Sequence, residues 1–205
     1  MSDTPVRDTT ASDTTASDPV DGTTYTPPPP LPGVGQVLPA PDLARRLAEL
    51  RAAGRRVAFA NGHFDLLHVG HLRYLNAARA EADALVVAIN DDASVARLKG
   101  PGRPLVPAAE RAELLAALAP VDFVTVFSGA SPAPLLAELQ PDVHCKGTDY
   151  GTPERVPEYA TVRAYGGETR LVGDPKDHNT SDLIGAARAL PAAEDGGAAG
   201  KEASS

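Results

Sequence analysis

The 205-residue sequence lacks several features on which common protein classes depend. Its one cysteine, Cys145, excludes an internal disulfide and a cysteine-rich zinc site. No apolar run approaches the roughly 20 residues that a helix needs to span a bilayer. The N-terminal segment also shows no basic stretch followed by an apolar one, as a secretion signal would. We therefore expect a protein of the reducing cytoplasm that does not enter a membrane.

Basic charge is scarce as well. Lys and Arg number 19 against 27 Asp and Glu, which gives a formal net charge of −8. Nucleic-acid binding needs a basic face, so this balance excludes a general affinity for nucleic acid. Much of the acidic charge lies near the two ends of the chain, which leaves room for a local basic pocket that binds phosphates.

The composition divides the chain into a central domain and two ends of low complexity. Nine of the 20 prolines fall between Pro5 and Pro41, among many Asp, Thr and Ser residues. Such a segment cannot bury enough apolar surface to offset the entropy lost on ordering. The last fifteen residues are mostly Ala, Gly, Glu and Ser. We expect a disordered arm at 1–40, a folded domain at 41–190 and a disordered tail at 191–205.

Strand and helix patterns alternate through the central domain. Short apolar runs predict strands, and amphipathic runs predict helices. The expected strands are 56–60, 84–90, 123–127, 142–146 and 169–172, and the expected helices are 43–53, 69–82, 92–98, 108–118, 134–139, 156–165 and 181–190. This alternation predicts a Rossmann-like, three-layer α/β/α fold with a parallel sheet of about five strands. Ligands of such sheets bind at the carboxyl ends of the strands.

The densest group of unusual residues is NGHFDLLHVGH at 61–71, where an expected strand ends and a helix begins. Gly62 lets the backbone approach a ligand closely, and the start of the helix offers N–H groups and a positive dipole end to a phosphate. His68 and His71 are three residues apart and share a helix face, with Gly70 leaving room between them. Two imidazoles placed there can stabilise the charge that develops during phosphoryl transfer.

Two other interpretations of these histidines stay open. A histidine pair at this spacing is often structural. His63, His68 and His71 are also three potential zinc ligands, although a zinc site usually brings a nearby carboxylate and supporting hydrogen-bond partners. We expect no resident metal.

The string at 61–71 resembles the signature of the HxGH, cytidylyltransferase-like, nucleotidyltransferase superfamily. Within it, the likeness is strongest to the D-glycero-β-D-manno-heptose 1-phosphate adenylyltransferases of ADP-heptose synthesis, and it runs from about 57 to 184. Four further blocks follow in order: NDDASVARLKGPGRPLVP at 90–107, AERAELLAALAPVDFV at 109–124, the PDV…KG.DY pattern at 141–150, and AYGGE at 164–168. The resemblance implies transfer of AMP from ATP to a sugar 1-phosphate, with Mg²⁺ and with release of pyrophosphate.

The resemblance also implies roles for individual residues. His68, His71 and Lys146 would be catalytic and contact the reacting phosphates. Lys99 and Arg103 would bind the sugar phosphate or the leaving pyrophosphate. The residues that would bind the nucleotide are Asn61, Gly62, His63, Phe64, Gly70, Asp149, Thr180 and Ser181, with Tyr150 lying beside them.

Each role has a purely structural alternative. Lys99 and Arg103 can be solvated loop charges, and Asp65 or Thr180 can be simple helix caps. Arg111 is expected to pair with Glu110 or Glu113 on the helix surface, or to anchor the sheet, rather than to bind a ligand. Asp92 is expected to cap the helix that follows it.

The sequence departs from the heptose enzymes at two places. His63 stands where they usually carry Cys, and residues 178–182 replace their Ser-Thr-Thr turn, adding the negative charge of Asp182 near Lys176 and His178. These changes bear on the sugar more than on the reaction. A cytidylyltransferase for glycerol phosphate or another alcohol phosphate, and a non-catalytic nucleotide-binding module, stay open as alternatives. The resemblance further implies a homodimer and a separate sugar kinase that makes the acceptor.

Overall fold

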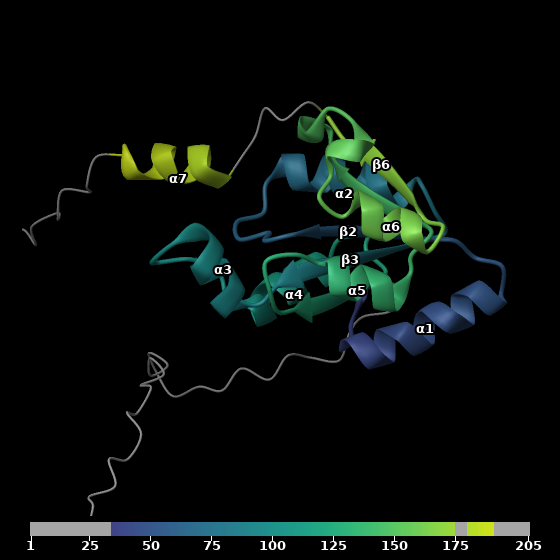
Figure 1. The fold of residues 1–205 in the computed structure, drawn as a ribbon. Helices are drawn as coiled ribbons and strands as arrows, with labels where there is room; N and C mark the ends of the chain where they lie inside the picture. The colour runs from purple at the N-terminus through teal and green to yellow at the C-terminus, as the bar shows by residue number, and fades with distance from the viewer. Residues whose placement is uncertain (1–33, 175–179, 191–205) are drawn as a thin grey trace, which may run out of the picture.

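A parallel sheet of six strands organises the part of the chain that the computed structural model describes, residues 34–174 and 180–190 (Figure 1). The strands are β1 (Gln36–Val37), β2 (Val57–Gly62), β3 (Ala84–Asn90), β4 (Phe123–Phe127), β5 (Val143–Gly147) and β6 (Glu168–Val172). Their order across the sheet is β1-β4-β3-β2-β5-β6, and every pair is parallel. The chain therefore winds outward from β2 in one direction through β4 and in the other through β6. The switch point lies between β2 and β5.

Helices connect the strands. They are α1 (Ala40–Ala52), α2 (Val69–Arg79), α3 (Asp92–Lys99), α4 (Ala108–Ala116), α5 (Ala133–Leu139), α6 (Tyr159–Ala164) and α7 (Thr180–Arg188), with short 3₁₀ turns η1 (Thr148–Tyr150) and η2 (Pro153–Arg155). In Figure 1, α7 stands clear of the helices that cover the sheet. None of the helices within residues 34–174 and 180–190 has the length and apolar character needed to cross a bilayer.

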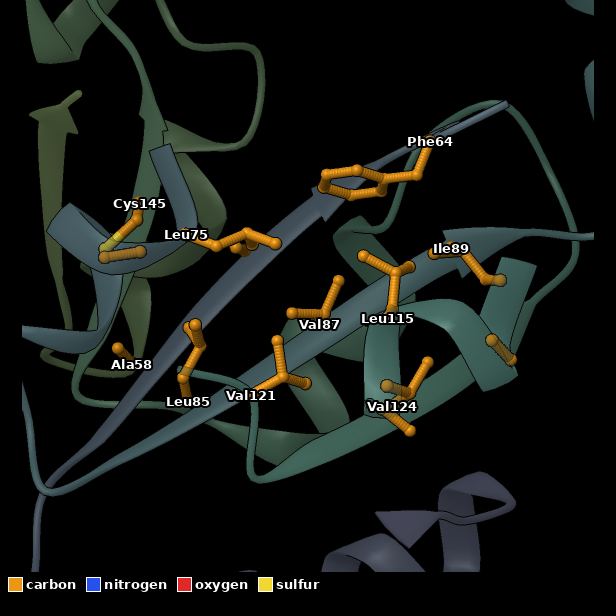
Figure 2. Packing of buried hydrophobic residues seen from close by; sticks show 14 of the residues in the cluster. Ala58, Phe64, Leu75, Leu85, Val87, Ile89, Leu115, Val121, Val124 and Cys145 are labelled. Carbon is orange, nitrogen blue, oxygen red and sulfur yellow. The ribbon is translucent and has the colours of Figure 1, made fainter. Parts of the chain in front are cut away.

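Alternate residues of the strands feed two separate cores. On one face, Ala58 and Ala60 of β2 pack with Leu75 of α2 and Leu115 of α4 (Figure 2). On the other face, Phe59 of β2 packs with residues of α1, α5 and α6. All seven residues of β3 are buried, as expected for a central parallel strand that is covered on both sides. The predicted three-layer α/β/α fold is confirmed.

The sheet has one strand more than the sequence indicated. β1 lies inside the segment predicted as a disordered arm, and its residues Gln36 and Val37 pair with Phe123 and Val124 of β4. The predicted boundary at residue 40 is thus several residues too late, because two paired residues are too few to give a periodic pattern. The rest of the arm, residues 1–33, and the tail at 191–205 lie outside the described residues.

Two local predictions are also wrong. The expected helix at 156–165 is shorter than predicted, because α6 begins only at Tyr159, after Pro157, and the separate turn η2 precedes it. The cap of α3 is Asp91, whose carboxylate accepts from the Ser94 N–H at 2.8 Å, rather than Asp92. Strands β3 and β4 match the predicted ranges residue for residue.

Candidate active site

A cleft of about 790 Å³ opens at the carboxyl ends of the central strands, beside the switch point between β2 and β5. This is where ligands bind in open parallel sheets. The predicted site residues that line it are Asn61, Gly62, His63, Phe64, His68, Gly70, His71, Lys99, Arg103, Lys146, Asp149 and Thr180. Ser181 follows Thr180 in α7, and its side chain lies outside the described residues. The structure thus brings together segments that are more than 100 positions apart in the sequence.

The turn after β2 is shaped by Gly62 and Phe64. Phe64 has a positive φ of 48° and is buried, and its ring folds back over Gly62. A Cβ at Gly62 would lie 2.9 Å from that ring, so only glycine fits here without movement of the phenyl group. The same ring packs on His71, with centroids 5.0 Å apart. The turn therefore holds one wall of the cleft in place.

The two motif histidines lie together at the start of α2. Their rings are stacked, with centroids 3.8 Å apart and planes inclined by 23°. His68 is the N-cap residue, but its side chain makes no capping hydrogen bond. The first N–H groups of α2 are therefore left without a side-chain cap, as a helix start that binds an anion requires.

The start of α7 lies beside the loop that leads into α2. The Thr180 hydroxyl donates to the Leu66 carbonyl oxygen at 3.4 Å. Two helix N-termini, each with a positive dipole end, thus meet on the same side of the cleft.

Lys146 is the penultimate residue of β5 and is 9% exposed. Its Nζ donates to Asn61 Oδ1 at 3.3 Å, lies 4.0 Å from Glu158 Oε2 and sits 5.3 Å from the centroid of the Tyr150 ring. A buried ammonium group needs such partners. Nothing in the sequence indicated that Glu158, twelve residues later, would be one of these partners.

His144 fixes the orientation of the Asn61 amide from below the cleft. The side chain is fully buried, and its Nε2 lies 3.0 Å from Asn61 Oδ1, the oxygen that also accepts from Lys146. Burial, followed by the positive charge of Lys146, lowers the pKa of His144 to about 3. The imidazole is therefore neutral near pH 7, with its proton on Nε2. Sequence reasoning missed this residue because a histidine within a strand pattern carries no functional signal of its own.

The buried His144 gives a testable dependence of stability on pH. The unfolded chain protonates this imidazole near pH 6.5, whereas the native chain does so only near pH 3. Stability is therefore lost as the pH falls below about 6.5. When the pH is lowered from 7.5 to 5.5, the unfolding free energy of the unaltered protein should fall by about 1.4 kcal/mol more than that of His144→Leu, which has no imidazole at this position. Urea titrations at the two pH values measure this difference, and identical losses in both proteins would contradict it.

Asp65 is not a helix cap. Its carboxylate accepts from the N–H groups of Leu105 and Val106 at 2.6 and 3.0 Å and pairs with Arg103 at 2.5 Å. Burial alone would raise the pKa of Asp65, but the hydrogen bonds from Val106 and Arg103 outweigh it and hold the pKa below its usual value. Arg103 thus ties its Gly- and Pro-rich loop to the turn after β2, while it still lines the cleft.

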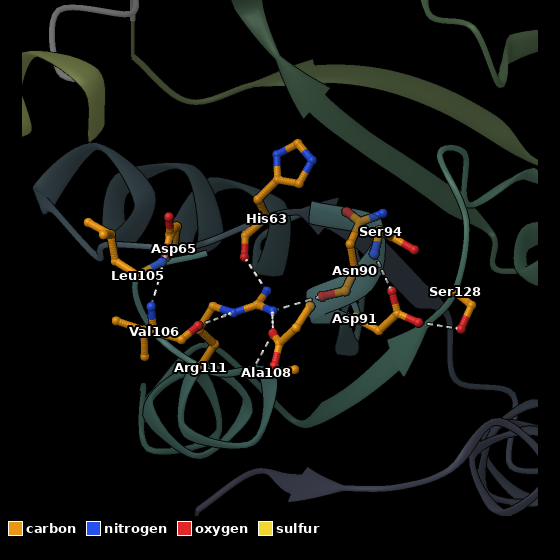
Figure 3. A network of polar contacts seen from close by, with 11 residues as sticks. His63, Asp65, Asn90, Asp91, Ser94, Leu105, Val106, Ala108, Arg111 and Ser128 are labelled. Atoms are coloured by element: carbon orange, nitrogen blue, oxygen red, sulfur yellow. Dashed lines mark hydrogen bonds and ion pairs between the residues drawn. The ribbon is translucent and has the colours of Figure 1, made fainter. Parts of the chain in front are cut away.

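His63 lies close enough to Lys99 and Arg111 for their positive charges to affect its protonation. Its pKa is lowered first by burial and then by the charges of Lys99 and Arg111. Figure 3 shows its ring directed away from Arg111, although its carbonyl oxygen accepts from that guanidinium. His63 therefore presents a neutral imidazole to the cleft near pH 7.

Arg111 is a buried anchor beneath the cleft (Figure 3). Its guanidinium donates to the carbonyl oxygens of Val106, His63 and Asn90 at 2.8, 2.7 and 3.0 Å, and to Asp92 Oδ1 at 2.6 Å. The expectation of a sheet anchor is confirmed. The expectation of an ion pair with a glutamate of its own helix is wrong, because the acid that Arg111 contacts is Asp92 of α3.

The zinc site that the sequence left open as an alternative is not formed in the described residues. Within 34–174 and 180–190, no three His, Cys, Asp or Glu side chains are grouped so that they could hold a metal ion. Mg²⁺ has a different requirement, because proteins usually bind it through substrate phosphates and one or two carboxylates. The cleft is lined by the carboxylates of Asp149 and Asp174, which fit that donor set.

Comparison with known proteins adds to this geometry. The chain is 47% identical over 148 residues to "Bifunctional protein HldE" of Ectopseudomonas mendocina (strain ymp), which is 72% of this chain and 31% of the relative. It is 52% identical over 134 residues to the protein of the same name from Geotalea uraniireducens (strain Rf4), 65% of this chain and 27% of that relative. The chain therefore spans about a third of the length of these curated relatives.

Two solved structures resemble the fold. The lipopolysaccharide core biosynthesis protein from Thermoplasma volcanium GSS1 superposes with a TM-score of 0.50 at 26% identity, covering 60% of this chain and 100% of that one. The pantoate-beta-alanine ligase from Francisella tularensis superposes with a TM-score of 0.51, covering 75% of this chain and 77% of that one. At 13% identity, the second likeness concerns the fold alone.

The family model described as cytidylyltransferase-like matches residues 59–182, which is more than half of the chain. The match begins in β2 and ends in α7, so it takes in the strand ends and both helix starts that form the cleft. The chain belongs to the cytidylyltransferase-like family of nucleotidyltransferases.

Proposed function

We propose that this protein transfers the AMP group of ATP to the phosphate of a sugar 1-phosphate and releases pyrophosphate. The observation that carries the proposal is the stacked pair His68 and His71, at an uncapped helix start in the same cleft as Lys146. A triphosphate needs N–H donors and positive charge, and this arrangement supplies both.

The proposed reaction is a direct in-line displacement. An oxygen of the acceptor phosphate bonds to the α-phosphorus of ATP, and the bond from that phosphorus to its β-bridging oxygen breaks. Pyrophosphate leaves with the electron pair. A phosphate monoester is a sufficient nucleophile near neutral pH, so no covalent enzyme intermediate is required. Catalysis then consists mostly of positioning and of stabilising charge.

The residues of the cleft divide this work. His68 and His71 donate hydrogen bonds to the oxygens of the α-phosphate as charge builds on them. Lys146, held by Asn61, adds a positive charge near the same phosphorus. Thr180 and the start of α7 bind the β- and γ-phosphates. Mg²⁺ bound with ATP, held by the phosphates together with carboxylates such as Asp149, would supply charge neutralisation for the leaving pyrophosphate.

The resemblance of five sequence blocks to heptose 1-phosphate adenylyltransferases supports a heptose 1-phosphate as the acceptor. The likeness to a solved structure described as a lipopolysaccharide core biosynthesis protein is in keeping with a sugar acceptor. His63, which departs from the heptose enzymes, lines the cleft and bears on which sugar is used.

A substrate panel tests the proposal. Pyrophosphate release is measured with Mg²⁺ and either ATP or CTP, each against heptose 1-phosphate, other sugar 1-phosphates and glycerol phosphate. We expect release to be fastest with ATP and heptose 1-phosphate. Fastest release with CTP and an alcohol phosphate would favour a cytidylyltransferase. Tight ATP binding without release from any acceptor would favour a non-catalytic module.

Three further expectations complete the proposal. A separate kinase makes the sugar 1-phosphate, as the resemblance to the heptose enzymes implies. The protein forms a homodimer, which light scattering of the purified chain would test. It acts in the cytoplasm, where both ATP and the acceptor are available.

A further inference from the structure

A buried carboxylate that the sequence did not single out faces the cleft. Glu158 lies directly before α6, and its side chain is 6% exposed. One oxygen, Oε1, accepts from the Ser131 hydroxyl at 3.0 Å. The other, Oε2, is buried without a hydrogen-bond partner among the described residues and lies 4.0 Å from Lys146 Nζ. Leaving such an oxygen without a donor costs free energy, which a ligand bound in the cleft would recover.

Glu158 lies on the side of the cleft away from the two helix starts. It comes from the layer of α5 and α6, which packs on one face of the sheet, whereas α2 packs on the other face. Lys146 lies between the two sides, because it contacts both Asn61 at the end of β2 and Glu158. The cleft therefore has the two helix starts, which suit phosphates, on one side and an acidic side at Glu158 on the other, with Lys146 between them.

The chemistry of a carboxylate limits what binds on the acidic side. Glu158 repels phosphate oxygens but accepts strongly from hydroxyl groups, because hydrogen bonds to an ionised acceptor are the stronger ones. The acceptor's phosphate must reach the α-phosphorus near Lys146 and the histidines. An acceptor whose phosphate is held beside Lys146 would have its hydroxyl groups within reach of Glu158, because Oε2 lies 4.0 Å from Lys146 Nζ.

We propose that Glu158 Oε2 accepts a hydrogen bond from a hydroxyl group of the acceptor and so selects a polyhydroxylated phosphate. This inference rests on the proposed nucleotidyl transfer, but it does not depend on which nucleotide is transferred. Ser131 holds the carboxylate in the orientation that presents Oε2 to the acceptor.

Variants at Glu158 test this role through acceptor selectivity. Pyrophosphate release is compared for a sugar 1-phosphate and its singly deoxygenated analogues, with whichever triphosphate the unaltered protein prefers. Glu158→Ala should raise the KM of the hydroxylated acceptor about 10- to 100-fold, the effect of losing a hydrogen bond to a charged group. Because Glu158 also pairs with Lys146, kcat should fall as well, but by the same factor for the hydroxylated and the deoxygenated acceptors. The ratio of the KM values for the deoxygenated and the hydroxylated acceptor therefore reports the proposed hydrogen bond. Glu158→Gln, which keeps an acceptor oxygen, should recover part of the selectivity.

The exposed Glu154 in η2 provides the matched control, because Glu154→Gln removes the same charge four residues away. Glu154→Gln should leave the KM and the kcat for every acceptor unchanged. If Glu158 only orients Lys146, both variants will lower kcat equally for all acceptors and keep the selectivity, which overturns the inference. Should Glu158→Ala fail to fold, the isosteric Glu158→Gln tests the inference through the same comparison of hydroxylated and deoxygenated acceptors.

The outcomes separate this inference from the proposed function. If the unaltered protein transfers AMP equally well to hydroxylated and deoxygenated phosphates, the transfer reaction stands and the role of Glu158 is refuted. If it transfers CMP instead, the adenylyl assignment fails, but the effect of the Glu158 variants on acceptor selectivity is still measured with CTP. If it transfers nothing, calorimetry gives the ratio of the dissociation constants of the deoxygenated and the hydroxylated acceptor. A ratio that Glu158→Ala leaves unchanged refutes the inference.

Discussion

Replacing His71 with alanine is expected to lower kcat by about 10²- to 10³-fold, equivalent to about 3–4 kcal/mol of transition-state stabilisation. The imidazole lies against His68 and Phe64 at the start of α2. In the proposed displacement it donates to an oxygen whose negative charge grows as the α-phosphorus becomes five-coordinate. Such a donor contributes more in the transition state than in the bound ground state, so the loss should fall on kcat more than on the KM for ATP.

Two further variants of α2 make the His71 experiment specific. His71→Gln places an amide donor near the position of Nε2 and should regain part of the lost rate. Asn76→Ala changes an exposed residue of the same helix and should leave kcat within about twofold, as surface substitutions usually have small effects. Single-turnover rates with saturating ATP and acceptor, together with thermal unfolding of each variant, measure these effects. A turnover near that of the unaltered protein in His71→Ala would remove this residue from the mechanism.

The position of these histidines could be predicted from sequence because the relevant signals are local. A glycine turn after an apolar run, followed by histidines three residues apart, places both rings on one face of a helix start. The buried strand β3 was equally predictable, because seven uncharged, mostly β-branched or small residues have no other stable location in a soluble fold. Each of these inferences needs only neighbouring residues.

The contacts that complete the site were not predictable, because they join distant segments. His144 and Asn61 are 83 positions apart, and Asp65 and Arg103 are 38 apart. The meeting of His144 with Asn61 depends on the strand order, which places β5 beside β2 only because the winding reverses after β4. Glu158 likewise could not be identified as a site residue from the sequence, because its role depends on its contact with Lys146. Sequence patterns gave the residue types at each strand end, but not which ends adjoin.

The contacts of Arg111 also join segments that are distant in the sequence, and removing them should have a large effect on stability. Arg111→Met is expected to lower the free energy of unfolding by about 3–5 kcal/mol, the usual cost of removing one partner from a buried charged network. The apolar stem of methionine fills much of the space but leaves the carbonyl oxygens of His63, Asn90 and Val106 without this donor. For a domain of this size, the melting temperature should fall by roughly 10 °C.

Activity should fall together with stability in this variant, for a reason that separates Arg111 from the catalytic groups. The guanidinium connects the turn after β2, the end of β3 and the loop that carries Arg103, so its loss loosens several walls of the cleft at once. The KM values for both substrates should therefore rise, whereas His71→Ala acts mainly on kcat.

Chemical denaturation and initial rates, measured well below the melting temperature, test the role of Arg111. Glu113→Gln, at an exposed position of α4, is the matched control and should leave stability within about 0.5 kcal/mol. Arg111→Lys should be intermediate, because an ammonium group retains the charge but cannot reproduce the planar fork that reaches all four acceptors. An Arg111→Met protein as stable as the unaltered chain would mean that water replaces the guanidinium, and that the walls of the cleft are held independently of this residue.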